Sequence, residues 1–266
     1  MGYTIGIEIK MNIREIILEK LDGIEKSEDV KVLYACESGS RAWGFPSADS
    51  DYDVRFIYVH PLDWYLSVFE QRDVIEVPIN DSLDINGWDL KKTLGLLSKS
   101  NPPLLEWLGS PIIYRENTEA SNRLRKLGES FYSPTSCAYH YLHMARGNFR
   151  EYLQGDEVWT KKYFYVLRPV LAINWIEAGL GVPPTDFNIV LDRIVTDSTL
   201  RAAIDKLLVE KRAGNELRKG PRIAPISDYI ESQLTKWGEG RFQHVHNPST
   251  RQELDQTFRE IVKTFG

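Results

Sequence analysis

The chain has 266 residues, of which 42% are hydrophobic and 27% are charged, the balance of an ordinary globular protein. That length allows one large domain or two modest ones. The net charge of -5 argues against a general nucleic-acid coat, which needs a basic surface, although it allows a local basic channel. No apolar run approaches the roughly 20 residues that span a bilayer, and Cys36 and Cys137 are too few for a disulfide scaffold. We expect a cytoplasmic protein with two buried, reduced thiols.

Hydrophobic patterning predicts a helix and several strands in the first part of the chain. Residues 11–26 carry isoleucine and leucine at helical spacing, which gives one apolar stripe. Four apolar runs predict strands: 30–38, 52–59, 74–79 and 82–88. The connector over residues 60–73 is expected to be partly helical. Asp89 is a good N-cap for a following helix, which Asn101-Pro102-Pro103 ends.

The pattern becomes helical from about residue 116, and no further strand is expected. Helices are predicted over 116–132, 134–153, 160–179, 185–194, 197–212, 224–237 and 249–264. We therefore predict an α+β architecture, with an α/β domain and a mixed sheet over residues 1–115. An all-helical domain over residues 116–266 would close a cleft between the two, where ligand sites are common.

One motif carries chemistry: Gly39-Ser40, ten intervening residues, then Asp51-Tyr52-Asp53. Alternate residues of a strand share a face, so Asp51 and Asp53 project together, roughly 7 Å apart. Two such carboxylates can share hard divalent cations such as Mg2+, and a Gly-Ser turn can offer backbone N–H groups to phosphate oxygens. A strand edge with two solvated aspartates is the plain alternative. Aspartate is disfavoured in strands, however, and the pairing of cradle and carboxylates is what nucleotidyl transfer requires.

The spacing of this motif resembles the signature of the DNA polymerase beta-type nucleotidyltransferase superfamily. Four longer blocks resemble the RNA-ligase-associated nucleotidyltransferase-like proteins of bacteria and phages: ACESGSRAWGFPSADSDYDVRFIYV, DINGWDLKK, KKYFYVLRP and GPRIAPISDYIE. The similarity covers roughly residues 30–235. It implies that residues 1–115 form a polymerase-beta-like catalytic domain. It also implies two Mg2+ (or Mn2+) ions on the aspartates and a nucleoside triphosphate held by Gly39 and Ser40.

The superfamily adds a third carboxylate on a later strand. Asp84 fits best, because it is a lone acid between apolar residues in a strand-like run. A turn aspartate after Asp81 is the alternative reading of that position. Asp89 is the second candidate, although its place before an apolar helix favours capping, and Glu76 is the third.

Basic side chains near these positions are candidates for phosphate binding. Arg41 follows the glycine-serine turn, while Arg55 shares a strand face with the two aspartates and could pair with them instead. Lys161 and Arg168 could hold a triphosphate from the helical domain, or form a solvated face or a buried ion pair. Residues 206–222 are the densest basic stretch, which either guides a nucleic-acid backbone or is a solvated helix.

These observations predict a metal-dependent nucleotidyltransferase that moves NMP from an NTP, such as ATP, to an acceptor hydroxyl and releases pyrophosphate. The resemblance implies RNA repair, with an RNA end as acceptor. Transfer of AMP to a protein or a small molecule is a second enzymatic reading, since the same fold supports several acceptors. A non-catalytic nucleotide-binding regulatory module is the alternative outside catalysis. Trp43 and Phe45 could stack on a base or pack the turn, and we do not include them in the predicted site.

Overall fold

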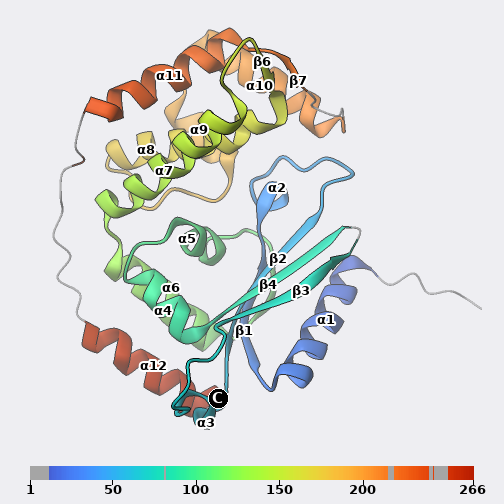
Figure 1. Ribbon diagram of the computed structural model, residues 1–266, viewed down its shortest axis with the longest axis vertical. Helices are drawn as coiled ribbons and strands as arrows, with labels where there is room; N and C mark the ends of the chain where they lie inside the picture. Colours follow the sequence, from blue (N-terminus) through green and yellow to red (C-terminus); the bar gives the residue numbers. More distant parts are fainter. Residues whose placement is uncertain (1–11, 81, 215–218, 240–241, 243–250) are drawn as a thin grey trace, which may run out of the picture.

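A mixed five-stranded sheet occupies the lower half of the molecule in Figure 1, and five of the later helices lie above it. The computed structural model describes residues 12–80, 82–214, 219–239, 242 and 251–266. Within those ranges every helix is too short or too polar to traverse a lipid bilayer. The predicted α+β architecture, a mixed sheet followed by a helical region, is confirmed.

The sheet has the strand order β3-β4-β2-β1-β5, in which β2 and β4 are parallel and the other pairs are antiparallel. Its strands are β1 (Lys31–Glu37), β2 (Tyr52–Val59), β3 (Val74–Asn80), β4 (Leu83–Asp89) and β5 (Ile113–Glu116). Central strands buried on both faces need continuous apolar runs, and this is why β1 and β2 could be predicted. The sequence did not predict β5, because four residues are too few for a periodic pattern.

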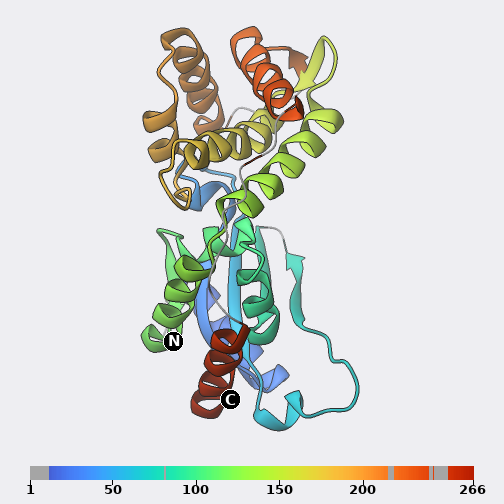
Figure 2. The same cartoon turned by 90° about the vertical axis from the view of Figure 1, so that its left-hand side faces the viewer.

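Helices cover both faces of the sheet. Helix α1 (Ile13–Glu28) starts with a capping box at Asn12 and packs its apolar stripe on one face. The other face is covered by α4 (Leu90–Leu97), α5 (Pro102–Leu108), α6 (Thr118–Phe131) and α12 (Arg251–Phe265). Helix α12 contacts α4, α6 and β2, so the end of the chain returns to the sheet (Figures 1 and 2). The thiols of Cys36 and Cys137 are free and buried, as predicted.

The helices above the sheet match the predicted ones within a few residues at each end. They are α7 (Pro134–Tyr152), α8 (Tyr163–Glu177), α9 (Phe187–Ile194), α10 (Ser198–Arg212) and α11 (Ala224–Glu239). The expectation of no strand after residue 116 was wrong. Strands β6 (Glu157–Trp159) and β7 (Lys219–Pro221) form a small antiparallel pair, and each is too short to show alternation in the sequence.

A buried ion pair joins the two halves of the molecule. Arg168 of α8 lies 2.6 Å from the Glu106 carboxylate of α5, and both side chains are nearly buried. Tyr141 of α7 donates a hydrogen bond to the same carboxylate at 3.0 Å. The Arg168 guanidinium also stacks on Trp43 at 3.8 Å, directly after the glycine-serine turn. The position of that turn therefore depends on the helical half as well as on the sheet.

We predict that His60 makes the protein less stable in mild acid. His60 is 7% exposed after β2, stacks on Trp64 of α3 (Leu62–Tyr65) at 3.9 Å, and burial lowers its pKa to about 4. The unfolded chain binds this proton near pH 6.5 and the folded chain does not, so stability falls as the pH drops from 6.5 to 4. Denaturant unfolding at pH 6.5 and at pH 4 measures this effect. The free energy of unfolding should fall by about 1–2 kcal/mol more in the wild type than in His60→Phe, allowing for solvent screening. His140→Phe, at an exposed position, should follow the wild type. An equal fall of the unfolding free energy with pH in the wild type and in His60→Phe would contradict the lowered pKa of His60.

Candidate active site

The candidate site lies where β1 ends and β2 begins. Helix α2 (Gly39–Ala42) follows β1, and Asp51 and Asp53 stand at the start of β2. A cavity of about 310 Å³ opens there and is lined by Gly39, Ser40, Asp51 and Asp53, among others. The structure therefore brings the predicted turn and the predicted carboxylates to one cavity.

Gly39 must be glycine for this arrangement to exist. Its φ is +60°, a left-handed conformation that other residues adopt only at a cost. A Cβ at this position would overlap the Oδ2 atom of the Asp53 carboxylate. The turn and the carboxylate are thus in direct contact. The first N–H groups of a helix lack intrahelical partners, so the start of α2 beside the cavity can donate to an anion.

The backbone of Asp53 is fixed from both sides. Its N–H donates to the buried Glu37 carboxylate at 2.8 Å, and its carbonyl accepts from the Ser38 N–H at 2.8 Å. Tyr114 of β5 donates its hydroxyl to the same Glu37 carboxylate. Burial raises the pKa of Glu37, and the hydrogen bonds from Tyr114 and Asp53 oppose that rise. The place of Asp53 is therefore set by hydrogen bonds to the sheet.

Asp84 stands beside Asp53 on the neighbouring strand, with Arg55 between them. In the parallel ladder of β2 and β4, Asp53 is the register partner of Asp84. The Arg55 Nη2 atom lies 2.7 Å from Asp84 Oδ2 and 3.4 Å from Asp53 Oδ1. The predicted alternative for Arg55, an ion pair with the aspartates on its own face, is confirmed for Asp53, while its other partner is Asp84 and not Asp51. Asp84 adjoins the site through this pair, although it does not line the cavity itself.

The two other acids considered as a third carboxylate have other partners. Asp89 caps α4 by accepting a hydrogen bond from the Lys91 N–H at 2.7 Å. It also accepts one from the Tyr65 hydroxyl at 2.6 Å. Its register partner in the ladder is Tyr58, at the far end of β2 from Asp53. Glu76 on the edge strand β3 is exposed and accepts a hydrogen bond from Arg72. Of the three acids, Asp84 lies beside Asp53, and its role as a third carboxylate stays a prediction.

Two predicted phosphate-binding arginines make internal contacts instead of lining the cavity. Arg41 donates to the carbonyls of Ser50 at 2.7 Å and Asp51 at 3.2 Å, and it stacks on Tyr52 at 3.7 Å. Arg168 forms the buried ion pair described above. Both hold the loop around the carboxylates, and direct phosphate binding by either residue stays a prediction.

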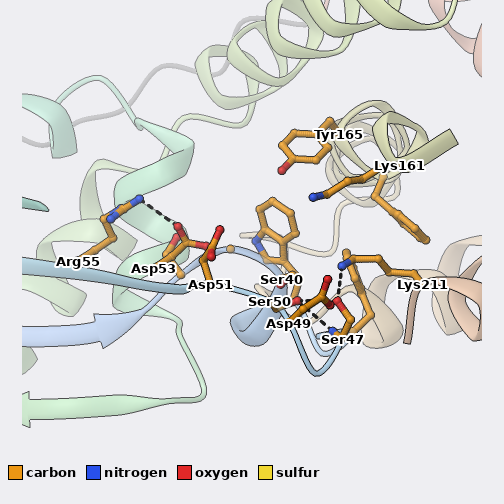
Figure 3. A pocket seen from close by; sticks show the side chains of 15 residues that line it. Ser40, Ser47, Asp49, Ser50, Asp51, Asp53, Arg55, Lys161, Tyr165 and Lys211 are labelled. Carbon is orange, nitrogen blue, oxygen red and sulfur yellow. Dashed lines mark hydrogen bonds and ion pairs between the residues drawn. The ribbon is translucent and has the colours of Figure 1, made fainter. Parts of the chain in front are cut away.

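Lysines from the helical half face the aspartates across the cavity (Figure 3). Lys161 comes from the 3-10 turn Thr160–Lys162, and Lys211 comes from α10. The Lys211 ammonium donates to Ser47 Oγ at 2.7 Å. Burial lowers the pKa of Lys211, and the nearby positive charge of Lys161 lowers it further. Two ammonium groups held this close are suited to a polyphosphate, whose negative charge would relieve their repulsion.

The sequence places Lys211 only within a basic stretch and indicates no role for Ser47. The two residues lie far apart in the chain and meet only when their segments pack together. Tyr165 of α8 lines the cavity beside Lys161 (Figure 3). Phe45 is 1% exposed and stacks on Phe164, while Trp43 packs against Arg168 and also lines the cavity, so stacking of Trp43 on a base stays untested.

The residues present fit one hard cation. Asp51 and Asp53 open onto the same cavity, and carboxylate oxygens are the ligands that Mg2+ and Mn2+ prefer. Burial raises the pKa of Asp53, Arg55 opposes that rise, and the charges of Asp84 and Asp51 add to it. A cation beside Asp53 would relieve this negative charge. Among the described residues, no cluster of three or more metal-ligating side chains is found.

We predict that Gly39→Ala abolishes Mg2+-dependent nucleotide binding. The added Cβ overlaps the Asp53 carboxylate and must displace it, while the positive φ costs about 1 kcal/mol of stability. Gly179→Ala is the matched control, because Gly179 has a φ of +70° and open space around a Cβ. Both variants should lose similar stability in denaturant unfolding, and only Gly39→Ala should lose binding in calorimetry. Normal binding by Gly39→Ala would contradict the geometry.

This chain is similar to other proteins in sequence and in structure. The Bacillus subtilis (strain 168) protein YcgL, described as uncharacterized, is 52% identical over 224 residues, covering 84% of this chain and 86% of that protein. A crystal structure of a nucleotidyltransferase-like protein from Exiguobacterium sibiricum 255-15 aligns over 95% of this chain and 90% of its own. Its identity of 12% and TM-score of 0.33 support no inference about the present chain. The family model described as RNA repair pathway DNA polymerase beta family matches residues 13–260. The chain belongs to this family of polymerase-beta-like nucleotidyltransferases.

Proposed function

We propose that this protein is a metal-dependent nucleotidyltransferase that transfers NMP from an NTP to an acceptor hydroxyl and releases pyrophosphate. One observation carries the proposal. Asp51 and Asp53 open onto the same cavity as Lys161 and Lys211, with the Gly39 turn against the Asp53 carboxylate (Figure 3). A cavity lined by both carboxylates and ammonium groups suits a divalent cation and a polyphosphate together.

Each side chain then has a role in the transfer. Asp51 and Asp53 would hold Mg2+ or Mn2+, and the bound cation would neutralise charge on the phosphate oxygens and lower the pKa of the acceptor hydroxyl. Lys161 and Lys211 would hold the β- and γ-phosphates, and the N–H groups at Gly39 would donate to phosphate oxygens. The acceptor oxygen attacks the α-phosphorus and passes its proton to water. The bond between the α-phosphorus and the oxygen that bridges to the β-phosphate breaks, and pyrophosphate leaves with that oxygen. Positioning and charge neutralisation supply most of the acceleration.

We further propose that the catalytic part is residues 1–115, that residues 116–266 close the cleft, and that the protein acts in the cytoplasm. The carboxylates come from the sheet and the lysines from the helical half, which supports a site between the two. The family's RNA repair context favours an RNA end as acceptor, with ATP as the first donor to test. Incubation with each α-labelled NTP and either cellular RNA or cellular protein would identify donor and acceptor together.

Asp51→Asn and Asp53→Asn are each expected to lower pyrophosphate release by about 100-fold or more while leaving the fold intact. The amide keeps the size of the side chain and removes the charge that binds the cation. Asp255→Asn is the control, at an exposed position of α12. Undiminished turnover in Asp51→Asn or Asp53→Asn would refute the proposed roles. Nucleotide binding without pyrophosphate release by the wild type would favour a regulatory module instead.

Substitutions at Asp84 and Asp89 are predicted to have different effects, the first on turnover and the second on stability. Asp84→Ala removes the acid opposite Asp53 and should lower turnover with little change in unfolding free energy. Asp89→Ala removes the α4 cap and the partner of Tyr65, and should cost about 1–2 kcal/mol of stability. Steady-state assays and denaturant unfolding of both variants would measure the two effects. The reverse result, with activity lost only in Asp89→Ala, would make Asp89 the functional acid.

A further inference from the structure

Arg55 occupies the space between two of the three acids at the site. Its Nη2 atom bridges Asp84 Oδ2 at 2.7 Å and Asp53 Oδ1 at 3.4 Å, and a dashed line marks the latter contact in Figure 3. Its Nη1 atom donates to the carbonyls of Asp84 at 3.2 Å and Val54 at 3.1 Å. The side chain is 18% exposed. These contacts hold the guanidinium in place, unlike a solvated surface arginine.

The fold itself places the guanidinium there. Arg55 follows Asp53 on the same face of β2, and the parallel register sets Asp84 beside Asp53. The planar guanidinium presents several donors at once, and it can therefore join two carboxylates from neighbouring strands. Loss of this bridge would leave Asp53 and Asp84 as adjacent like charges.

The two oxygens of the Asp53 carboxylate face different neighbours. Oδ1 faces Arg55 and Asp84, while Oδ2 faces the Gly39 turn. Asp51 and Asp53 line the cavity, and Asp84 does not. A pair of catalytic cations lies about 3.5–4 Å apart and therefore needs carboxylates shared between both ions. The guanidinium fills the Asp84 side of Asp53, so a cation can reach this carboxylate from the cavity that Asp51 also lines.

We propose that Arg55 takes the place of a second divalent cation, so that the active site binds one cation, between Asp51 and Asp53. This inference rests on the proposed nucleotidyltransferase function and departs from the two ions expected by resemblance. Arg55 then supplies a permanent positive charge on the Asp84 side of the site. Asp84 acts by orienting that guanidinium.

Electron paramagnetic resonance of bound Mn2+ tests this inference without measuring activity. Wild-type protein, saturated with α,β-methylene-ATP and titrated with Mn2+, should bind about one ion per chain, with the spectrum of an isolated ion. Arg55→Gln and Arg55→Leu each free the space between Asp53 and Asp84. Either folded variant should bind about two ions per chain, and their spectra should show spin coupling between close ions. Thermal melting confirms that each variant is folded, and samples of nucleotide alone supply the background.

Arg115→Gln is the matched control. Arg115 also joins two carboxylates, Asp22 and Glu25, and is 21% exposed, but it lies on β5 away from the cavity. The number of Mn2+ ions bound per chain should be the same in Arg115→Gln as in the wild type. Two coupled ions in the wild type would overturn the role of Arg55 and leave the proposed function standing. One ion in both Arg55 variants would overturn it as well. If the wild type bound no Mn2+ at saturating nucleotide, the inference and the proposed function would both fall.

Discussion

The contact between the Gly39 turn and the Asp53 carboxylate is the constraint on which the site depends. The antiparallel pairing of β1 with β2 brings the end of one strand to the start of the other. The hydrogen bond from the Ser38 N–H to the Asp53 carbonyl and that from the Asp53 N–H to Glu37 then fix the distance between turn and acid. Because only glycine leaves room for the carboxylate, the turn and Asp53 can line one cavity.

The loop between the turn and Asp51 is held by its own hydrogen bonds, including those from Arg41, and by the helical half of the molecule. Phe187 of α9 donates its N–H to the Trp43 carbonyl at 3.0 Å, and Arg212 of α10 donates to the Gly44 carbonyl at 3.1 Å. Lys211 adds its hydrogen bond to Ser47. Residues from both halves of the molecule therefore line the cavity. Carboxylates from one half and lysines from the other give the cavity both signs of charge, which the proposed nucleotide and cation would require.

The elements of the sheet that carry chemistry could be predicted because their signals are local. Central strands are apolar runs, and strand alternation places Asp51, Asp53 and Arg55 on one face. The partners of Arg168 and Lys211 could not be predicted, because Glu106 and Ser47 reach them only through packing of distant segments. Short strands such as β5 and β6 leave no periodicity to detect. The same reasoning predicted a phosphate role for Arg41, whose guanidinium is held by loop carbonyls in the structure.

The proposed function requires a divalent cation between Asp51 and Asp53, on the side of these carboxylates that lines the cavity. Anomalous diffraction from crystals soaked with Mn2+ and α,β-methylene-ATP measures that place directly. We expect one peak within about 2.0–2.4 Å of an oxygen from each aspartate, with the triphosphate extending toward Lys161 and Lys211. A nucleotide bound in the cavity with no Mn2+ peak near either carboxylate would contradict the account.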